Sequence, residues 1–239
     1  MRLDRYLVEQ KIFESRNRAI EAIKNGIVTV DGKRAKPSSK IDTNSNIEIK
    51  DSKFYVSRAA MKLEGFLEEH YVDIKGKRVL DIGSSTGGFA QIVLENDPKS
   101  IDCVDVGRDQ LHHSLHSNPV LNLHEQTDIR EFETDKCFEI ITCDVSFISI
   151  LQIIDDIQRL SCDYSDIIIL YKPQFEVGKE TKRDSKGVVS DQNAIQKAMK
   201  EFEEQTKIKK WLLIHKSVSK LSGKEGNIEY LYHFKKEKK

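Results

Sequence analysis

The stretch VLDIGSSTGGFAQIVL, residues 79–94, joins an apolar run to an amphipathic pattern through a turn with three glycines. The run is typical of a buried strand, and the pattern after it predicts a helix over 87–96. Gly83, Gly87 and Gly88 let the backbone turn sharply and approach a ligand closely. A strand, a glycine-rich turn and a helix in this order predict the first unit of an open α/β sheet, with a ligand site at the turn.

From Lys77 onward, short apolar runs alternate with amphipathic segments. Strands that alternate with helices predict a doubly wound, mostly parallel sheet. A helix over 59–70 precedes this sheet. The predicted strands are 78–83, 100–107, 120–128, 138–147, 166–172, 210–219 and 228–234, and the predicted helices are 87–96, 108–117, 148–160 and 192–206.

The first fifty residues predict a separate small α+β unit. Two short helices, 1–10 and 16–25, precede a strand with an Asp31-Gly32 turn and a second strand at 46–50. Ser15 is a candidate cap of the second helix, and Gly26 ends it. We therefore predict a small domain over 1–52, a linker over 53–61 and an α/β domain over 62–239.

Charge is distributed unevenly, although 39 Lys+Arg balance 39 Asp+Glu over the whole chain. Residues 1–50 carry eleven basic and seven acidic side chains, a net charge of +4, which leaves −4 for the remainder. A basic N-terminal segment favours contact with phosphates, although a charged surface that only faces water would have the same net charge. The candidate RNA-binding residues are Arg2, Arg5, Arg16, Arg18, Lys24, Lys33, Arg34 and Lys36, joined by Lys182 and Arg183 of the basic loop 179–186.

Acidic residues follow three successive strands and indicate the kind of ligand. Asp81 precedes the glycine-rich turn, Asp105 lies where this fold binds a ribose diol, and Asp128 follows the third strand. A carboxylate beside the turn suits an ammonium group better than a pyrophosphate, which favours S-adenosylmethionine over NAD. The candidate cofactor-binding residues are Asp81, Gly83, Ser84, Ser85, Thr86, Gly87, Gly88, Phe89, Asp105, Val106, Asp128, Ile129 and Asp144.

A lysine ends the most apolar strand, in IIILYKPQFEVG, residues 167–178. Lys172 and Asp144 end neighbouring predicted strands, and Lys62 and Glu229 complete a set of two ammonium groups and two carboxylates. Burial and a second ammonium allow a lysine amine to accept a proton from a weakly acidic hydroxyl. The alternatives are a lysine at a strand's exit into water and two structural salt bridges.

Seven motifs in this order resemble the TlyA family of bacterial rRNA ribose 2′-O-methyltransferases, which are sometimes also called hemolysins. They are YVSRAAMKL, DIGSSTGGF, VDVGRDQL, DVSFISI, KPQFEVGK, KGVV and GNIEYL, all between residues 55 and 231. With the first fifty residues included, the resemblance covers essentially the whole chain. The resemblance implies an N-terminal RNA-binding domain of the alpha-L type and a Rossmann-like, FtsJ-type methyltransferase sheet. It also implies S-adenosylmethionine as cofactor and a cytidine of 23S rRNA, sometimes also of 16S rRNA, as target.

The family's Lys-Asp-Lys-Glu tetrad corresponds to Lys62, Asp144, Lys172 and Glu229. Lys172 would be the base, or would hold the attacking 2′-hydroxyl that Asp144 orients. Lys62 would contact the target nucleotide, and Glu229 would anchor a lysine. The chain departs from the family pattern at Ala59-Ala60, where two glycines are usual, and at Asp128, where an asparagine is usual.

The remaining features give two expectations and two open questions. We expect Cys103, Cys137 and Cys143 to be buried free thiols. We also expect the protein to be a cytoplasmic monomer without a membrane segment, with rRNA or a ribosomal subunit as its partner. Phe54-Tyr55-Val56 is either a linker anchor or a hinge. His112 and His116 lie four apart on a predicted helix, where surface histidines are favoured over a metal pair. The rival functions are a small-molecule methyltransferase and a membrane-active hemolysin.

Overall fold

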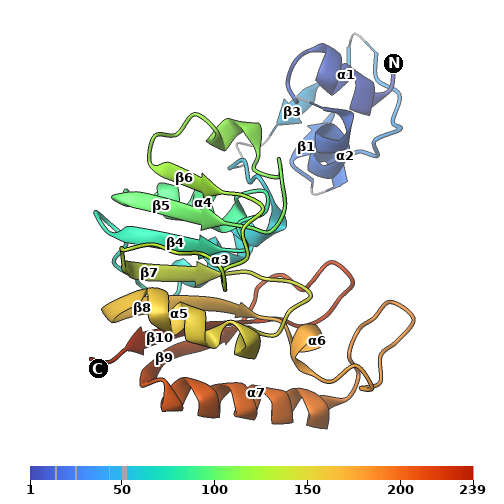
Figure 1. Ribbon diagram of the computed structural model, residues 1–239. Coiled ribbons are helices and arrows are strands. Elements are labelled where there is room, and N and C mark those ends of the chain that lie inside the picture. The colour runs from blue at the N-terminus through green and yellow to red at the C-terminus, as the bar shows by residue number, and fades with distance from the viewer. Residues whose placement is uncertain (14, 25, 43, 50–52, 239) are drawn as a thin grey trace. The chain divides into compact units, whose positions relative to one another are not determined.

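The computed structural model describes residues 1–13, 15–24, 26–42, 44–49 and 53–238 (Figure 1). The chain divides into two compact units, Met1–Phe54 and Tyr55–Lys239. The end of the predicted small domain at residue 52 lies outside the described residues. The predicted linker, 53–61, contains the first turn of helix α3 (Arg58–Leu67).

The N-terminal unit combines helices α1 (Leu3–Glu9) and α2 (Arg16–Lys24) with strands β1 (Val28–Val30), β2 (Lys33–Arg34) and β3 (Ile47–Ile49). The order β2-β1-β3 is antiparallel throughout. Asp31 and Gly32 both have positive φ, 52° and 71°, as a two-residue hairpin turn requires. Leu3, Leu7, Ala19, Ile23 and Val28 form its buried core.

The second unit contains a seven-stranded sheet in the order β6-β5-β4-β7-β8-β10-β9 (Figure 1). Its strands are β4 (Arg78–Ile82), β5 (Ser100–Val104), β6 (Leu121–His124), β7 (Phe138–Cys143), β8 (Ser161–Tyr171), β9 (Trp211–Val218) and β10 (Tyr230–Lys236). The first five in this order are parallel, and β10 is antiparallel to both β8 and β9. This arrangement confirms the predicted Rossmann-like sheet.

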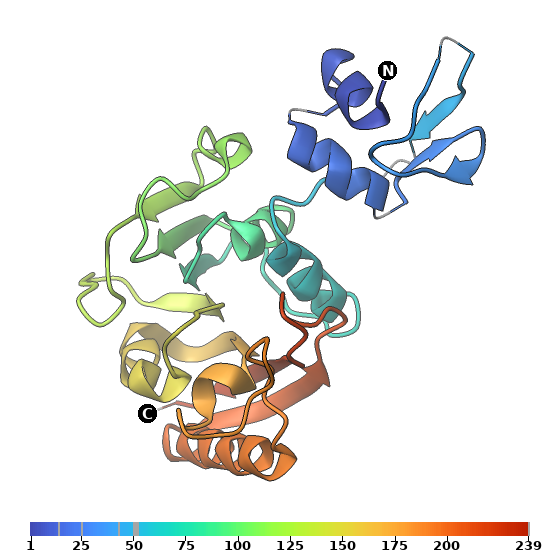
Figure 2. The same ribbon diagram turned by 90° about the vertical axis from the view of Figure 1, so that its right-hand side faces the viewer.

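Helices cover both faces of the sheet, which explains the continuous apolar runs of its central strands (Figure 2). Helices α3 and α4 (Gly88–Leu94) pack on one face, around Val79, Ile140 and Ile168. Helices α5 (Ile154–Leu160) and α7 (Gln192–Ile208) pack on the other, around Ile141, Ile167 and Tyr232. The short helix α6 (Pro173–Glu176) follows β8 directly, and among the described residues no helix is long and apolar enough to cross a bilayer.

Two helix predictions need correction. The segment predicted as a helix over 108–117 contains only a 3₁₀ turn, η1 (His113–Leu115). Its apolar residues, Leu111 and Leu115, pack with Val56 in a small separate cluster, so no long amphipathic face is needed. The helix predicted over 148–160 is divided into a 3₁₀ turn, η2 (Ile150–Gln152), and α5.

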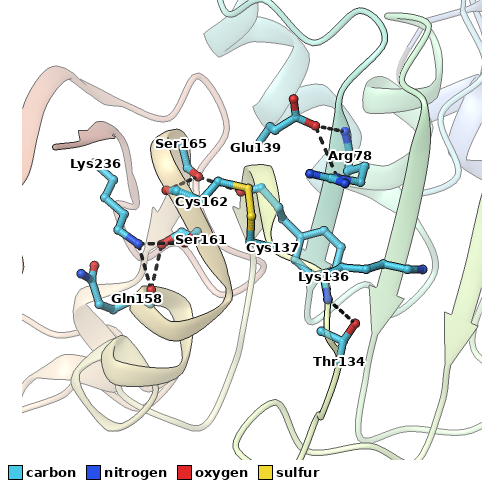
Figure 3. Close-up of a disulfide and its surroundings, with 11 residues drawn as sticks. Arg78, Thr134, Lys136, Cys137, Glu139, Gln158, Ser161, Cys162, Ser165 and Lys236 are labelled. Carbon is cyan, nitrogen blue, oxygen red and sulfur yellow. Dashed lines mark hydrogen bonds and ion pairs between the residues drawn. A yellow bond between two sulfur atoms is a disulfide. The ribbon is translucent and has the colours of Figure 1, made fainter. Parts of the chain in front are cut away.

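The expectation of a free thiol at Cys137 is wrong, because Cys137 forms a disulfide with Cys162 (Figure 3). The bond joins the residue before β7 to the second residue of β8. The pairing of β7 with β8 shifts its register near this bond. Ser165 donates hydrogen bonds to the carbonyl oxygens of Phe138 and Cys162 and so stabilises the irregular segment. Cys103 and Cys143 are buried free thiols, as expected.

Loss of this disulfide is expected to lower the free energy of unfolding by about 3–4 kcal/mol, because the bond closes a loop with a sequence separation of 25 residues. Urea unfolding of the wild type with and without a thiol reductant measures the effect. The double variant Cys137→Ser/Cys162→Ser should match the reduced wild type and should not respond to reductant. Equal midpoints for oxidised and reduced wild type would contradict the prediction.

Candidate active site

Three neighbouring strands bring charged residues to one edge of the sheet. Cys143 of β7 lies beside Ile169 of β8, and Tyr171 of β8 pairs with Tyr230 of β10. The residues that follow β7 and β8 and the residue that precedes β10 therefore lie at the same edge. These residues are Asp144, Lys172 and Glu229, and Lys62 comes from the middle of α3.

Lys172 and Asp144 form the first of two buried ion pairs. The Lys172 Nζ lies 2.6 Å from Asp144 Oδ1, and the two side chains are 10% and 15% exposed. The same Nζ donates a hydrogen bond of 2.8 Å to Ser146 Oγ. The lysine is thus held by two residues of the loop that follows β7.

Lys62 and Glu229 form the second pair. The Lys62 Nζ lies 2.5 Å from Glu229 Oε2, and the side chains are 10% and 3% exposed. Glu229 Oε1 accepts a hydrogen bond of 3.1 Å from Gln174 Nε2. A Cβ on Gly223 would lie 2.6 Å from Glu229 Oε1, so only glycine leaves room for this carboxylate.

The glycine-rich turn is in close contact with the end of β7 and with the start of α3. Gly83 has φ +77°, and a Cβ there would lie 2.8 Å from the carbonyl oxygen of Asp144. Gly88 begins α4, where a Cβ would lie 2.2 Å from Ser57 Oγ at the start of α3. The predicted turn therefore lies directly beside the segments that carry Asp144 and Lys62.

Asp105 follows β5 and is held by backbone amides. Its Oδ2 accepts from the N–H of Ser85 at 2.8 Å, and its Oδ1 accepts from the N–H of Gly107 at 2.7 Å. Ser85 is part of the turn and has φ 45°. The carboxylate is thereby fixed next to the turn, and the following Val106 is 71% exposed.

Asp128 and Asp81 differ in their surroundings. Arg130 donates hydrogen bonds to both oxygens of Asp128, which lowers the pKa of this carboxyl group. Asp81 is fully buried in β4, and burial raises its pKa to about 7, although Thr142 donates to its Oδ1 at 2.7 Å. Among the described residues Asp81 Oδ2 accepts no well-formed hydrogen bond, although the backbone N–H of Ala90 in α4 also acts on this carboxyl group and opposes the rise of its pKa. A carboxylate at this position would add negative charge beneath the turn, which favours a cationic ligand group there.

Four other residues that are predicted to bind the cofactor lie in the turn or in the two cores of the domain. Ser84 and Thr86 lie in the turn, between the glycines. Phe89 and Ile129 are buried in the two cores on opposite faces of the sheet. Their side chains therefore position the turn and the loop after β6.

Several predicted RNA-binding groups already have partners within the protein. Arg2 and Arg16 both bind the buried Asp4, with their Nη2 atoms 2.9 Å from its Oδ2. Arg18 lies over the ring of Phe54, and Arg183 donates to the carbonyl oxygen of Gln174. The exposed remainder are Arg5, Lys24, Lys33, Arg34, Lys36 and Lys182.

Sequence reasoning missed four side chains around the ion pairs. Ser146 binds Lys172, and Gln174 binds Glu229. Phe147 is 92% exposed with φ 66°, and its ring centroid lies 5.1 Å from that of Phe175. The available signal was their position immediately after the ends of β7 and β8.

The predicted histidine pair does not lie within a helix, because His112 and His116 are the two residues that flank the 3₁₀ turn η1. His112 Nδ1 is 2.8 Å from Ser114 Oγ, and His116 Nε2 is 2.9 Å from the carbonyl oxygen of Leu111. Within the described part of the chain, no group of three His, Cys, Asp or Glu side chains could hold a metal ion.

Comparisons with known proteins place both units. The model of the FtsJ-like methyltransferase family matches residues 55–236, and that of the S4 domain matches residues 1–47. The 23S rRNA (cytidine-2′-O)-methyltransferase TlyA of Campylobacter jejuni is 46% identical over 98% of this chain and 99% of its own length. The 16S/23S rRNA (cytidine-2′-O)-methyltransferase TlyA of Mycobacterium tuberculosis is 34% identical over 96% of this chain and 87% of its own length.

A solved structure has the same fold over nearly the whole chain. It comes from Streptococcus thermophilus, is described as a candidate hemolysin, and is 31% identical with a TM-score of 0.74. The match extends over 99% of this chain and 88% of that one. With its S4 domain and its methyltransferase domain, the chain belongs to the TlyA branch of the FtsJ-like methyltransferases.

Proposed function

We propose that the protein transfers a methyl group from S-adenosylmethionine to the ribose 2′-hydroxyl of a cytidine in ribosomal RNA, with 23S rRNA as the favoured target and 16S rRNA as a second possibility. The observation that carries the proposal is the pair of buried Lys–carboxylate contacts, Lys172–Asp144 and Lys62–Glu229, directly beside the glycine-rich turn. The S4 domain supplies RNA affinity, and the substrate places the reaction in the cytoplasm.

The cofactor fits the acidic groups around the turn. The negative charge of Asp81 beneath the turn favours its ammonium group, and the carboxylate of Asp105 suits a ribose diol. Asp128 Oδ2 accepts one hydrogen bond from Arg130 and has a second lone pair, which suits an adenine amino group. S-adenosylmethionine supplies an electrophilic methyl group when it is bound.

The protein's own task is to position the 2′-hydroxyl and to take its proton. As an ammonium group, Lys172 Nζ holds the hydroxyl oxygen, and after losing one of its own protons to water it accepts the hydroxyl proton as a neutral amine. Asp144 and Ser146 fix the direction of that Nζ. Glu229 holds Lys62 beside the target nucleotide. Because the donor methyl group is already activated, positioning provides most of the rate.

Methyl transfer from radiolabelled S-adenosylmethionine to unmodified ribosomal subunits tests the proposal. We expect label on a cytidine, found by mapping alkali-resistant 2′-O-methyl positions. Separate reactions with large and small subunits distinguish 23S from 16S rRNA. Measurable cofactor binding without label on either subunit would overturn the proposed substrate.

Cofactor binding is expected to release about half a proton at pH 7 and almost none at pH 9. The pKa of Asp81 is raised from 3.8 to about 7 in the free protein, and a bound ammonium group favours its ionised form. Because this pKa is higher in the folded protein than in the unfolded chain, the free energy of unfolding falls as the pH rises from about 4 through about 7. This pH dependence is the reverse of the usual carboxylate case. Calorimetric titration in buffers of different ionisation enthalpy measures the released proton, and Asp81→Asn should abolish it.

A further inference from the structure

The four-residue helix α6 touches both ion pairs of the candidate active site. It begins immediately after Lys172, which is its N-cap residue. Two of its side chains, Gln174 and Glu176, point to different parts of the site.

Gln174 supports the Lys62–Glu229 pair. Its Nε2 donates to Glu229 Oε1 at 3.1 Å, while the other carboxylate oxygen, Oε2, contacts Lys62. The backbone of Gln174 is itself fixed, because its carbonyl oxygen accepts a hydrogen bond of 2.9 Å from Arg183 Nη2. The orientation of Glu229 therefore depends on two opposed donors, one on α3 and one on α6.

Glu176 supports the loop that carries Asp144 and Ser146. Its Oε2 accepts from Ser149 Oγ at 2.6 Å, and its Oε1 accepts from the N–H of Ile150 at 3.0 Å. These two residues open the 3₁₀ turn η2, which ends the loop after β7. Burial raises the pKa of Glu176, and the two hydrogen bonds oppose that shift because they stabilise the carboxylate. Both oxygens of Glu176 are therefore bound to the loop.

Lys172 is thereby connected to the β7 loop at two points. One is the contact of its own Nζ with Asp144 and Ser146. The other is Glu176, four residues further along the chain. A loop fixed at two points can hold Asp144 in one place, whereas a single ion pair would let the loop and the lysine move together.

We propose that Gln174 and Glu176 are positioning residues that set the relative placement of all four tetrad side chains. This inference rests on the proposed function, because it concerns the same site. Among the described residues, neither side chain forms a hydrogen bond or an ion pair with Lys62 or Lys172. Since a misplacement of about 1 Å can cost about 100-fold in rate, loss of either contact should lower kcat without weakening substrate binding.

The first experiment uses Glu176→Ala and its conservative counterpart, Glu176→Gln, in the full-length protein. For Glu176→Ala we expect kcat to fall by about 30-fold or more, with KM for the ribosomal subunit and Kd for the cofactor within about twofold of wild type. Glu176→Gln keeps an acceptor for the N–H of Ile150 and should recover most of kcat. Glu201→Ala, at an exposed position on α7, is the matched control.

The second experiment uses Gln174→Leu, which removes the donor but keeps similar volume. We expect kcat to fall while KM for the ribosomal subunit and Kd for the cofactor stay within about twofold of wild type, because Glu229 keeps Lys62 but loses the donor that orients its second oxygen. A purely structural residue would change KM, Kd and thermal stability together with kcat. Thermal midpoints of all variants are measured in parallel.

The results separate this inference from the proposed function. Unimpaired kcat in both Glu176→Ala and Gln174→Leu, on a wild type that labels rRNA, would overturn the inference alone. A loss of kcat that parallels a loss of thermal stability and that Glu176→Gln does not restore would also overturn it. A wild type that binds cofactor but labels no rRNA would overturn both.

Discussion

Replacement of Lys172 by arginine is expected to lower kcat for methyl transfer by about 10³-fold, while the Kd for S-adenosylmethionine stays near that of wild type. Arginine keeps the positive charge that the carboxylate of Asp144 needs in its 15% exposed position. Its guanidinium cannot be deprotonated in a protein, so it cannot accept the proton of a 2′-hydroxyl. Loss of a proton acceptor typically costs 10²–10⁴-fold, and 10³-fold is about 4 kcal/mol of activation free energy.

Lys172→Met is the companion variant. It removes proton acceptance and charge together, so it should match Lys172→Arg in kcat but unfold more readily, because Asp144 loses its partner. Single-turnover methylation, cofactor titration and urea unfolding separate these effects. An arginine variant that retains a tenth or more of wild-type kcat would show that Lys172 acts by charge alone, and the assignment of Lys172 as a base would be wrong.

The second large effect concerns the stability of the Lys62–Glu229 pair. Lys62→Met should lower the free energy of unfolding by about 3–5 kcal/mol, because it leaves a carboxylate that is 3% exposed without its cation. In the double variant Lys62→Met/Glu229→Leu neither charge remains, so most of that stability should return. Methyl transfer should be lost in both, since both lack the lysine that we propose to contact the target nucleotide.

Urea unfolding of the wild type, Lys62→Met, Glu229→Leu and the double variant gives a complete double-mutant cycle. The cofactor Kd serves as a check that the sheet remains intact. If the double variant were as unstable as Lys62→Met, the pair would contribute to packing and not through charge compensation. If the double variant kept its activity, neither residue would belong to the catalytic set.

Much of the sheet could be predicted because its signals are local. The apolar run 167–170 is buried on both faces, and Asp31-Gly32 forms the expected tight turn. The segment 108–117 shows where local signals fail. Its apolar spacing is compatible with a helix, but Leu111 and Leu115 find a partner in Val56, far away in the chain, and a single 3₁₀ turn is enough.

The site shows the same division. The strand-end positions of Lys172 and Asp144 could be predicted, because parallel strands end at one edge. The contacts of Gln174 and Glu176 could not, since they depend on how α6 packs against η2 and against the start of β10. The disulfide was missed for a related reason, because the approach of Cys137 to Cys162 depends on an irregular register between β7 and β8.

The contact between Lys62 and Glu229 spans 167 residues of sequence. Strand β10 also inserts between β8 and β9, so the sheet is completed by a segment near the carboxyl terminus. During synthesis a nascent chain therefore has its cofactor turn long before it has Glu229. Pairing over such distances is a late event in folding. A nascent chain that still lacks Glu229 would therefore contain the glycine-rich turn but not the complete set of four charged side chains.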